Sequence, residues 1–144
     1  MGGPGSGKTC QLLKVVDAVA PVESWVLDLE DKVGAFLEGV IPNNMHLEVA
    51  MDWEDIRSVV DTWKLKVKLD SWVMVDRADL LWTSAQRWYT QAKYKEPLAD
   101  LMLKKAQGIS KASFMVAPRF DQGSWQVINE NYEYVMMTLL YGLR

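Results

Sequence analysis

The feature that most constrains this chain is its opening segment, Gly2-Gly3-Pro4-Gly5-Ser6-Gly7-Lys8-Thr9, which matches the pattern G-x-x-x-x-G-K-[ST]. Glycines let the backbone curl so that successive N–H groups point at phosphate oxygens, where a side chain would block the approach. Lys8 can reach the β- and γ-phosphates, and the Thr9 hydroxyl can bind Mg²⁺. The segment therefore predicts a phosphate-binding loop for a nucleoside triphosphate.

A helix is expected to follow this loop, from Cys10 to about Ala20, with its positive dipole end towards the phosphates. Two interpretations of Cys10 stay open: a thiol whose pKa the helix start lowers, or a small side chain beneath the loop. As the single cysteine, it excludes an internal disulfide and fits a reducing compartment. The residues predicted to bind the nucleotide are Gly3, Gly5, Ser6, Gly7, Lys8, Thr9 and Cys10.

The position of the loop is also informative. Such a loop joins a buried strand to a helix, yet only Met1 precedes Gly2. At the other end, the apolar run 134–141 leads to Arg144 without a return strand. We therefore expect an incomplete fold, with the first strand and the C-terminal strands missing, and a chain that is part of a larger protein.

Composition is that of one α/β unit spanning residues 1–144, with 49% hydrophobic and 24% charged residues. The net charge of −3 gives no support for a strongly nucleic-acid-binding surface. Local basic patches, or simply solvated faces, remain open at Lys64-Leu65-Lys66-Val67-Lys68 and at Lys104, Lys105, Lys111 and Arg119. No signal peptide or apolar run of the ~20 residues needed for a membrane span is present, so we expect no membrane partner.

Hydrophobic patterning predicts strands that alternate with helices. Strands are expected at 25–29, 47–51 and 72–75, with a strand or extended loop at 113–117. Helices are expected at 33–38, at 53–63 with Asp52 as N-cap, at 78–107 with a break near Pro97, and from Trp125 with Ser124 as N-cap. This order predicts a three-layer fold with a mainly parallel sheet covered by helices on both faces.

Acidic residues follow two of the predicted strands, where ligands bind in parallel α/β sheets. Trp72-Val73-Met74-Val75-Asp76 is the Walker B pattern, and it lies 67 residues beyond Thr9. Asp76 is therefore predicted to hold Mg²⁺ opposite Thr9. In Asp28-Leu29-Glu30, a carboxylate could polarise the water that attacks the γ-phosphate, or could be only a loop acid.

Together, the loop, the strand ending in Leu27-Asp28-Leu29-Glu30 and the segment Val73–Trp82 resemble RecA-like P-loop ATPases, in particular compact phage-encoded ATPases of the AAA or RecA-like type. The resemblance covers about the first 85 residues. It implies an ATPase with ATP and Mg²⁺ as cofactors, in which Glu30 is the catalytic base and Lys8 acts on the phosphates. Arg77 departs from the pattern, because a small hydroxyl residue usually stands there.

The resemblance further implies a role in phage DNA recombination or replication, with single-stranded DNA as a partner, homo-oligomers and the host cytoplasm as location. A nucleotide or small-molecule kinase is the main competing hypothesis, since its loop is similar and Asp76-Arg77 could imitate an acceptor site. Against it, the arginines are scattered and form no lid segment. A DNA-packaging motor, which shares both Walker motifs, and a nucleotide-binding regulator that hydrolyses slowly also stay open.

Overall fold

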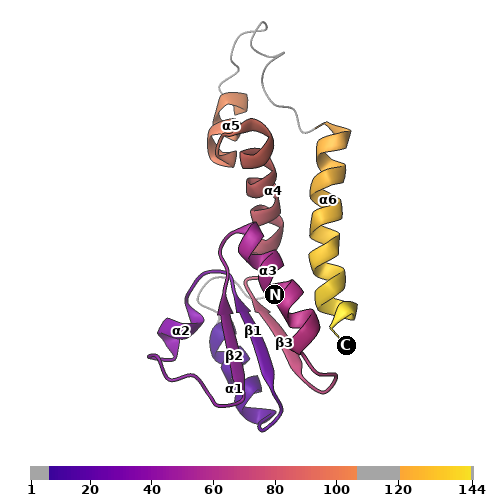
Figure 1. The fold of residues 1–144 in the computed structure, drawn as a ribbon. Helices are drawn as coiled ribbons and strands as arrows, with labels where there is room; N and C mark the ends of the chain where they lie inside the picture. The colour runs from indigo at the N-terminus through magenta and orange to yellow at the C-terminus, as the bar shows by residue number, and fades with distance from the viewer. Residues whose placement is uncertain (1–6, 107–120, 144) are drawn as a thin grey trace, which may run out of the picture.

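The computed structural model describes residues 7–106 and 121–143 and shows a mixed α/β fold around a small parallel sheet (Figure 1). The strands are β1 (Ser24–Asp28), β2 (Met45–Val49) and β3 (Trp72–Asp76). They lie in the order β2-β1-β3, and the register pairs Asp28 with Val49 on one side and with Asp76 on the other. The carboxyl ends of all three strands therefore meet at one edge of the sheet, which confirms the predicted parallel arrangement.

Helices precede, connect and follow these strands. They are α1 (Lys8–Ala18), α2 (Val33–Phe36), α3 (Trp53–Lys66), α4 (Asp79–Tyr94), α5 (Leu98–Ala106) and α6 (Gln122–Met137), the last running into a π-helical turn, η2 (Thr138–Gly142). Asp52 caps α3 as predicted, because its carboxylate accepts a hydrogen bond of 2.9 Å from the Asp55 N–H. The predicted break near Pro97 is confirmed, since α4 ends at Tyr94 and α5 begins at Leu98.

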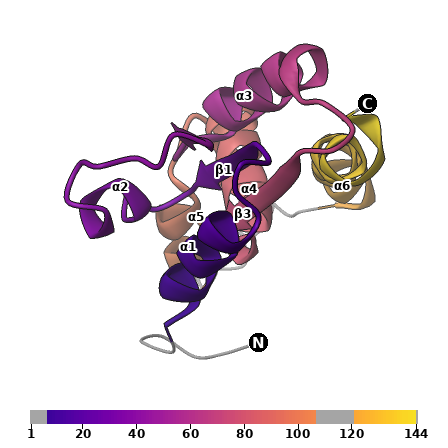
Figure 2. The ribbon, with the colours of Figure 1, turned by 90° about the horizontal axis from the view of Figure 1, so that it is seen from below.

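The sheet has a core on each face, because successive side chains of a strand point to opposite sides. On one face, Trp25 and Leu27 of β1 pack with buried residues of α3, α4 and α6. On the other, Val26 packs with Val16 of α1 and Val33 of α2. Figure 2 shows α1 and α3 on opposite sides of the sheet. The helices thus hold the strand ends in place from both faces.

Several sequence-based boundaries are wrong, and two of them have a clear physical reason. Strand β2 begins two residues earlier than predicted, because the buried Met45 pairs with Ser24 while Val49 and Met51 are exposed. Helix α6 is capped by Asp121 and not by Ser124: the Asp121 carboxylate accepts a 2.7 Å hydrogen bond from the Ser124 N–H, and Ser124 lies inside the helix. The predicted strand at 113–117 lies outside the described residues.

In the part of the chain that the structure describes, no helix is both long and apolar enough to cross a membrane.

Candidate functional site

The end of the glycine-rich motif lies where α1 begins. Gly7 is the N-cap of α1 and has a φ of 74°, a left-handed conformation that glycine adopts without steric cost. Lys8 and Thr9 are the first two residues of the helix, and Cys10 follows them with an exposed side chain. Of the predicted nucleotide-binding residues, Gly3, Gly5 and Ser6 lie outside the described residues. The three described residues of the motif, Gly7, Lys8 and Thr9, form a helix start, as the sequence predicts.

Thr9 and Asp76 come together although 67 residues separate them in the chain. The Thr9 hydroxyl donates a hydrogen bond of 3.3 Å to Asp76 Oδ2, which joins the start of α1 to the carboxyl end of β3. Asp76 is only 9% exposed, so little of its side chain is in contact with bulk water. A hydroxyl and a carboxylate are hard oxygen ligands, and Mg²⁺ usually binds one or two such protein groups while keeping several waters. The pair therefore fits the predicted magnesium site.

Glu30 lies just beyond the end of β1, the strand that pairs with β3. Its two carboxylate oxygens contact different cations: Oε2 accepts a 2.6 Å hydrogen bond from Lys32 Nζ, and Oε1 accepts one from the Arg77 guanidinium. The hydrogen bond from Lys32, with the charge of Arg77 beside it, lowers the pKa of Glu30. Glu30 is therefore held as a carboxylate, and each oxygen keeps a further lone pair that can accept a hydrogen bond from water.

Asp28 has a different role from Glu30, although the sequence places them two residues apart. Its side chain is fully buried, and it accepts hydrogen bonds from the backbone N–H of Glu30 (3.0 Å) and of Val33 (2.7 Å). These bonds fix the turn between β1 and α2 and satisfy an N–H group at the start of α2. Of the two acids in the segment, Asp28 holds the turn, and Glu30 faces the strand ends.

Sequence reasoning missed the contribution of Asp79 to this site. Asp79, the first residue of α4, accepts two hydrogen bonds from Arg77, from Nε at 3.0 Å and from a terminal nitrogen at 2.9 Å. The bonds from Arg77 lower the pKa of Asp79, and the charge of Lys8 lowers it further. Arg77 itself was the available signal in the sequence, because a cation between Asp76 and Asp79 is expected to pair with an acid.

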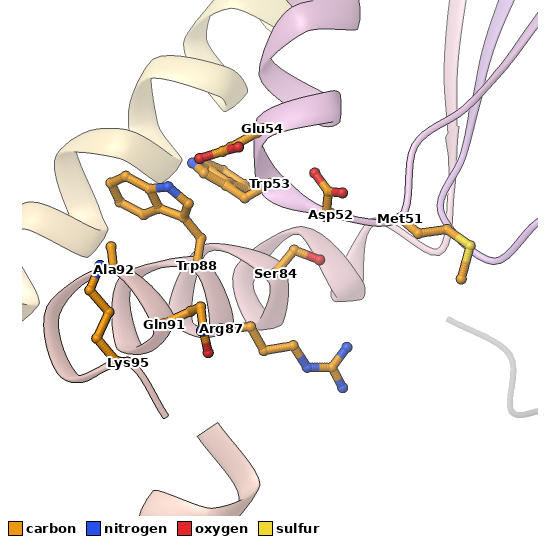
Figure 3. Close-up of a pocket in the computed structure, with 10 residues that line it drawn as sticks. All are labelled: Met51, Asp52, Trp53, Glu54, Ser84, Arg87, Trp88, Gln91, Ala92 and Lys95. Carbon is orange, nitrogen blue, oxygen red and sulfur yellow. The ribbon is translucent and has the colours of Figure 1, made fainter. Parts of the chain in front are cut away.

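A second feature lies further along α4, away from the residues just described. A cavity of about 630 Å³ opens between the start of α3 and one stripe of α4 (Figure 3). It is lined by Met51, Asp52, Trp53, Glu54, Ser84, Arg87, Trp88, Gln91, Ala92 and Lys95. Trp53 is 1% exposed, and its buried indole N–H has no hydrogen-bond partner among the described residues. The cavity has the size of a small-molecule site. It has an indole on each side, the cation Arg87 on α4 and the cation Lys95 just after the end of α4.

A comparison of the chain with protein-family models, curated proteins and solved structures finds no match. Any function must therefore be argued from the geometry of the strand ends.

Proposed function

We propose that this chain is a P-loop NTPase of RecA-like type, which binds ATP with Mg²⁺ and hydrolyses it. The observation that carries the proposal is the 3.3 Å contact between Thr9 and Asp76, with Lys8 next to Thr9 at the start of α1. It gathers at one edge of the sheet the hydroxyl, the carboxylate and the lysine that a triphosphate with its metal requires. A chance glycine-rich turn would not need an acid from a strand 67 residues away.

Each residue has a distinct role in the proposed reaction. Lys8 binds the β- and γ-phosphates through its ammonium group, and the backbone N–H groups at the start of α1 add to this. Thr9 and Asp76 hold Mg²⁺, which when bound supplies positive charge to the phosphate oxygens. Glu30 accepts the proton of the attacking water as the water oxygen bonds to the γ-phosphorus and the bond to ADP breaks. The products are ADP and inorganic phosphate.

DNA is the proposed context of this activity, on the resemblance to phage ATPases alone. We propose that the chain acts on or alongside single-stranded DNA, as a homo-oligomer in the host cytoplasm, during phage recombination or replication. A basic segment at Lys64–Lys68 offers cations for such a role, although Lys64 Nζ also donates a 2.7 Å hydrogen bond to Tyr134 and Lys68 pairs with Glu23 at 3.5 Å.

A kinase acting on a small phosphorylated molecule is the second candidate, and the cavity between α3 and α4 favours it. The indole of Trp88 could contact an apolar group, and Arg87 and Lys95 could pair with a phosphate. Asp52 and Glu54 line the same cavity and would repel an anion, which argues against this candidate.

One experiment separates the two candidates. ATP turnover is measured with Mg²⁺ alone, with single-stranded DNA, and with nucleoside monophosphates as acceptors. The ATPase proposal predicts that phosphate is released to water and that DNA raises its rate. Transfer of the phosphoryl group to an acceptor, with little release to water, would instead favour the kinase. A chain that neither binds nor turns over ATP contradicts both.

A further inference from the structure

Arg77 occupies a conformation that few side chains adopt. It follows Asp76 at the end of β3, and its φ is 63°, in the left-handed region that β-carbon atoms disfavour. Asparagine and glycine adopt this region more readily than arginine does. The turn leads directly into α4, with the Leu80 N–H bonded to the Arg77 carbonyl at 2.8 Å. The backbone conformation therefore does not favour arginine at this position. The contacts of the Arg77 side chain offer an explanation for its presence.

The guanidinium of Arg77 joins two acids that lie on different elements. Asp79 holds it by a two-bond fork, with distances of 3.0 and 2.9 Å, and the remaining terminal nitrogen donates to Glu30, 47 residues earlier in the chain. The guanidinium is planar and rigid, so a fork that fixes two of its nitrogens also fixes the direction of the third. The Arg77 side chain is 33% exposed and that of Glu30 is 20%, so water screens the pair only in part.

Lys32 is the other cation that contacts Glu30, but unlike Arg77 it does not connect Glu30 to another element of the fold. It lies two residues from Glu30 in the same turn, its side chain is 68% exposed, and its ammonium group has no fixed direction. If Glu30 moved, Lys32 could move with it. Arg77 instead ties Glu30 to the end of β3, where Asp76 and the start of α1 lie.

We propose that Arg77, oriented by Asp79, is a positioning residue that fixes the Glu30 carboxylate for the attacking water. The inference rests on the proposed ATPase function and adds to it two residues of this chain. Arg77 acts through Glu30 and not on the nucleotide, so its removal lowers the rate of hydrolysis and leaves ATP affinity in place. A simple surface ion pair between two strand ends would instead affect stability alone.

The test is a double-mutant cycle on single-turnover hydrolysis, with ATP affinity measured in parallel. The variants are Arg77→Asn, which suits the left-handed turn but is too short to reach Glu30, then Glu30→Gln and the combination. We expect Arg77→Asn to slow hydrolysis by roughly 10- to 100-fold, with ATP affinity changed less than about 3-fold. In the Glu30→Gln background the same change should have little further effect, because residues that act through one another are not additive.

Two further variants serve as controls. Lys32→Ala removes the other cation from Glu30 and should slow hydrolysis by less than about 3-fold, since Lys32 does not tie Glu30 to β3. Asp79→Asn keeps Arg77 but weakens the fork, and it should slow hydrolysis in the same direction by a smaller factor. Asp79→Asn also keeps the inference testable if Arg77→Asn does not fold, which circular dichroism and the melting temperature report.

The outcomes separate the inference from the proposed function. Hydrolysis that is unchanged in Arg77→Asn contradicts the inference alone. An equal loss with and without Glu30→Gln also contradicts it, because Arg77 would then act independently of Glu30. A loss of ATP affinity that matches the loss of rate assigns Arg77 to nucleotide binding and overturns the positioning role. If the wild-type chain does not hydrolyse ATP, or if its hydrolysis does not depend on Lys8, the proposed function itself is contradicted. The inference is then wrong as well.

Discussion

The carboxyl ends of β1 and β3 and the interface between α4 and α6 are held by different kinds of contact. At the strand ends, a few polar side chains meet across long separations in sequence, as Thr9 does with Asp76 and Glu30 with Arg77. Between α4 and α6, apolar and aromatic surfaces pack, and Ile128 is fully buried there.

Aromatic side chains dominate the helical interface. Trp82 stacks on Trp125 with ring centroids 6.2 Å apart, and it meets Tyr132 edge-on at 5.1 Å. A buried polar contact accompanies them, in which the Tyr89 hydroxyl donates a 2.8 Å hydrogen bond to Ser124. Such an interface contributes stability through buried area, whereas the strand ends contribute groups with a defined charge and direction. Mutations in the two regions should therefore affect different measurements.

Lys8→Ala should give the largest effect and should affect the strand ends alone. Lys8 is the only side-chain cation that the loop itself offers to the β- and γ-phosphates, so its removal should abolish hydrolysis, by on the order of 10²- to 10³-fold or more. Triphosphate binding should weaken strongly, and the melting temperature should stay near that of the wild type. ATP turnover and calorimetric affinity measure this, with Lys14→Ala on the same helix as a control. Near-normal turnover in folded Lys8→Ala would remove the phosphate-binding role.

Ile128→Ala should reverse this pattern. Ile128 is 0% exposed in the core shared by the sheet and α6, and truncating such a side chain typically costs about 2–5 kcal/mol of stability. Denaturant unfolding measures the loss, while ATP affinity of the remaining folded protein should be unchanged. Val127→Ala, one residue away and 40% exposed, is the matched control and should have little effect. Equal costs at the two positions would mean that α6 does not pack as described.

The contrast also explains how far the sequence predicts the fold. Continuous apolar runs such as 72–75 indicate buried parallel strands, and acids such as Asp76 mark their ends, so the strands and the Thr9–Asp76 meeting point follow from pattern and spacing. The boundaries of β2 did not follow, because the register with β1 decides which of its residues pair. Helical periodicity predicts α4 and α6 but not that they pack against each other. An apolar stripe shows that a helix face is buried, and it does not show which element covers that face.

The same limit applies within the candidate site. Apart from the resemblance, which favours Glu30, residue type and spacing do not separate Glu30 from Asp28. The structure shows that Asp28 is buried and accepts hydrogen bonds from two backbone N–H groups. The Asp121 cap was missed because serine and aspartate are both good N-caps and stand three residues apart. Arg77 was noted only as a departure from the pattern that the resemblance implies. Its partners, Asp79 at the start of α4 and Glu30 after β1, could not be predicted from their spacing in the sequence.

Asp76→Asn should have an intermediate effect and should sharpen the assignment of the strand ends. The amide keeps the shape of the side chain but lacks the charge that attracts Mg²⁺, so metal affinity should fall by about 10- to 100-fold. Nucleotide binding measured with and without Mg²⁺ should then become nearly equal. Asp70→Asn, at an exposed residue before the same strand, controls for the loss of one negative charge. If the variant keeps the Mg²⁺ dependence of the wild type, Asp76 is only an acid at the end of a strand.

Asp121→Ala should give the smallest effect, on the helical region alone. The hydrogen bonds from Ser124 hold the pKa of Asp121 below its ordinary value of 3.8. Because the folded-state pKa is lowered, the stabilisation is present above the ordinary value and is lost as the pH falls through the folded-state pKa. The variant should therefore lower the melting temperature by roughly a few degrees at neutral pH. The difference from the wild type should shrink at strongly acidic pH, whereas Asp121→Asn, which keeps a capping oxygen without a titrating charge, should keep most of its stability in both conditions. A cap whose loss leaves the melting temperature unchanged at every pH would show that packing of α6 against α4 holds the helix start without it.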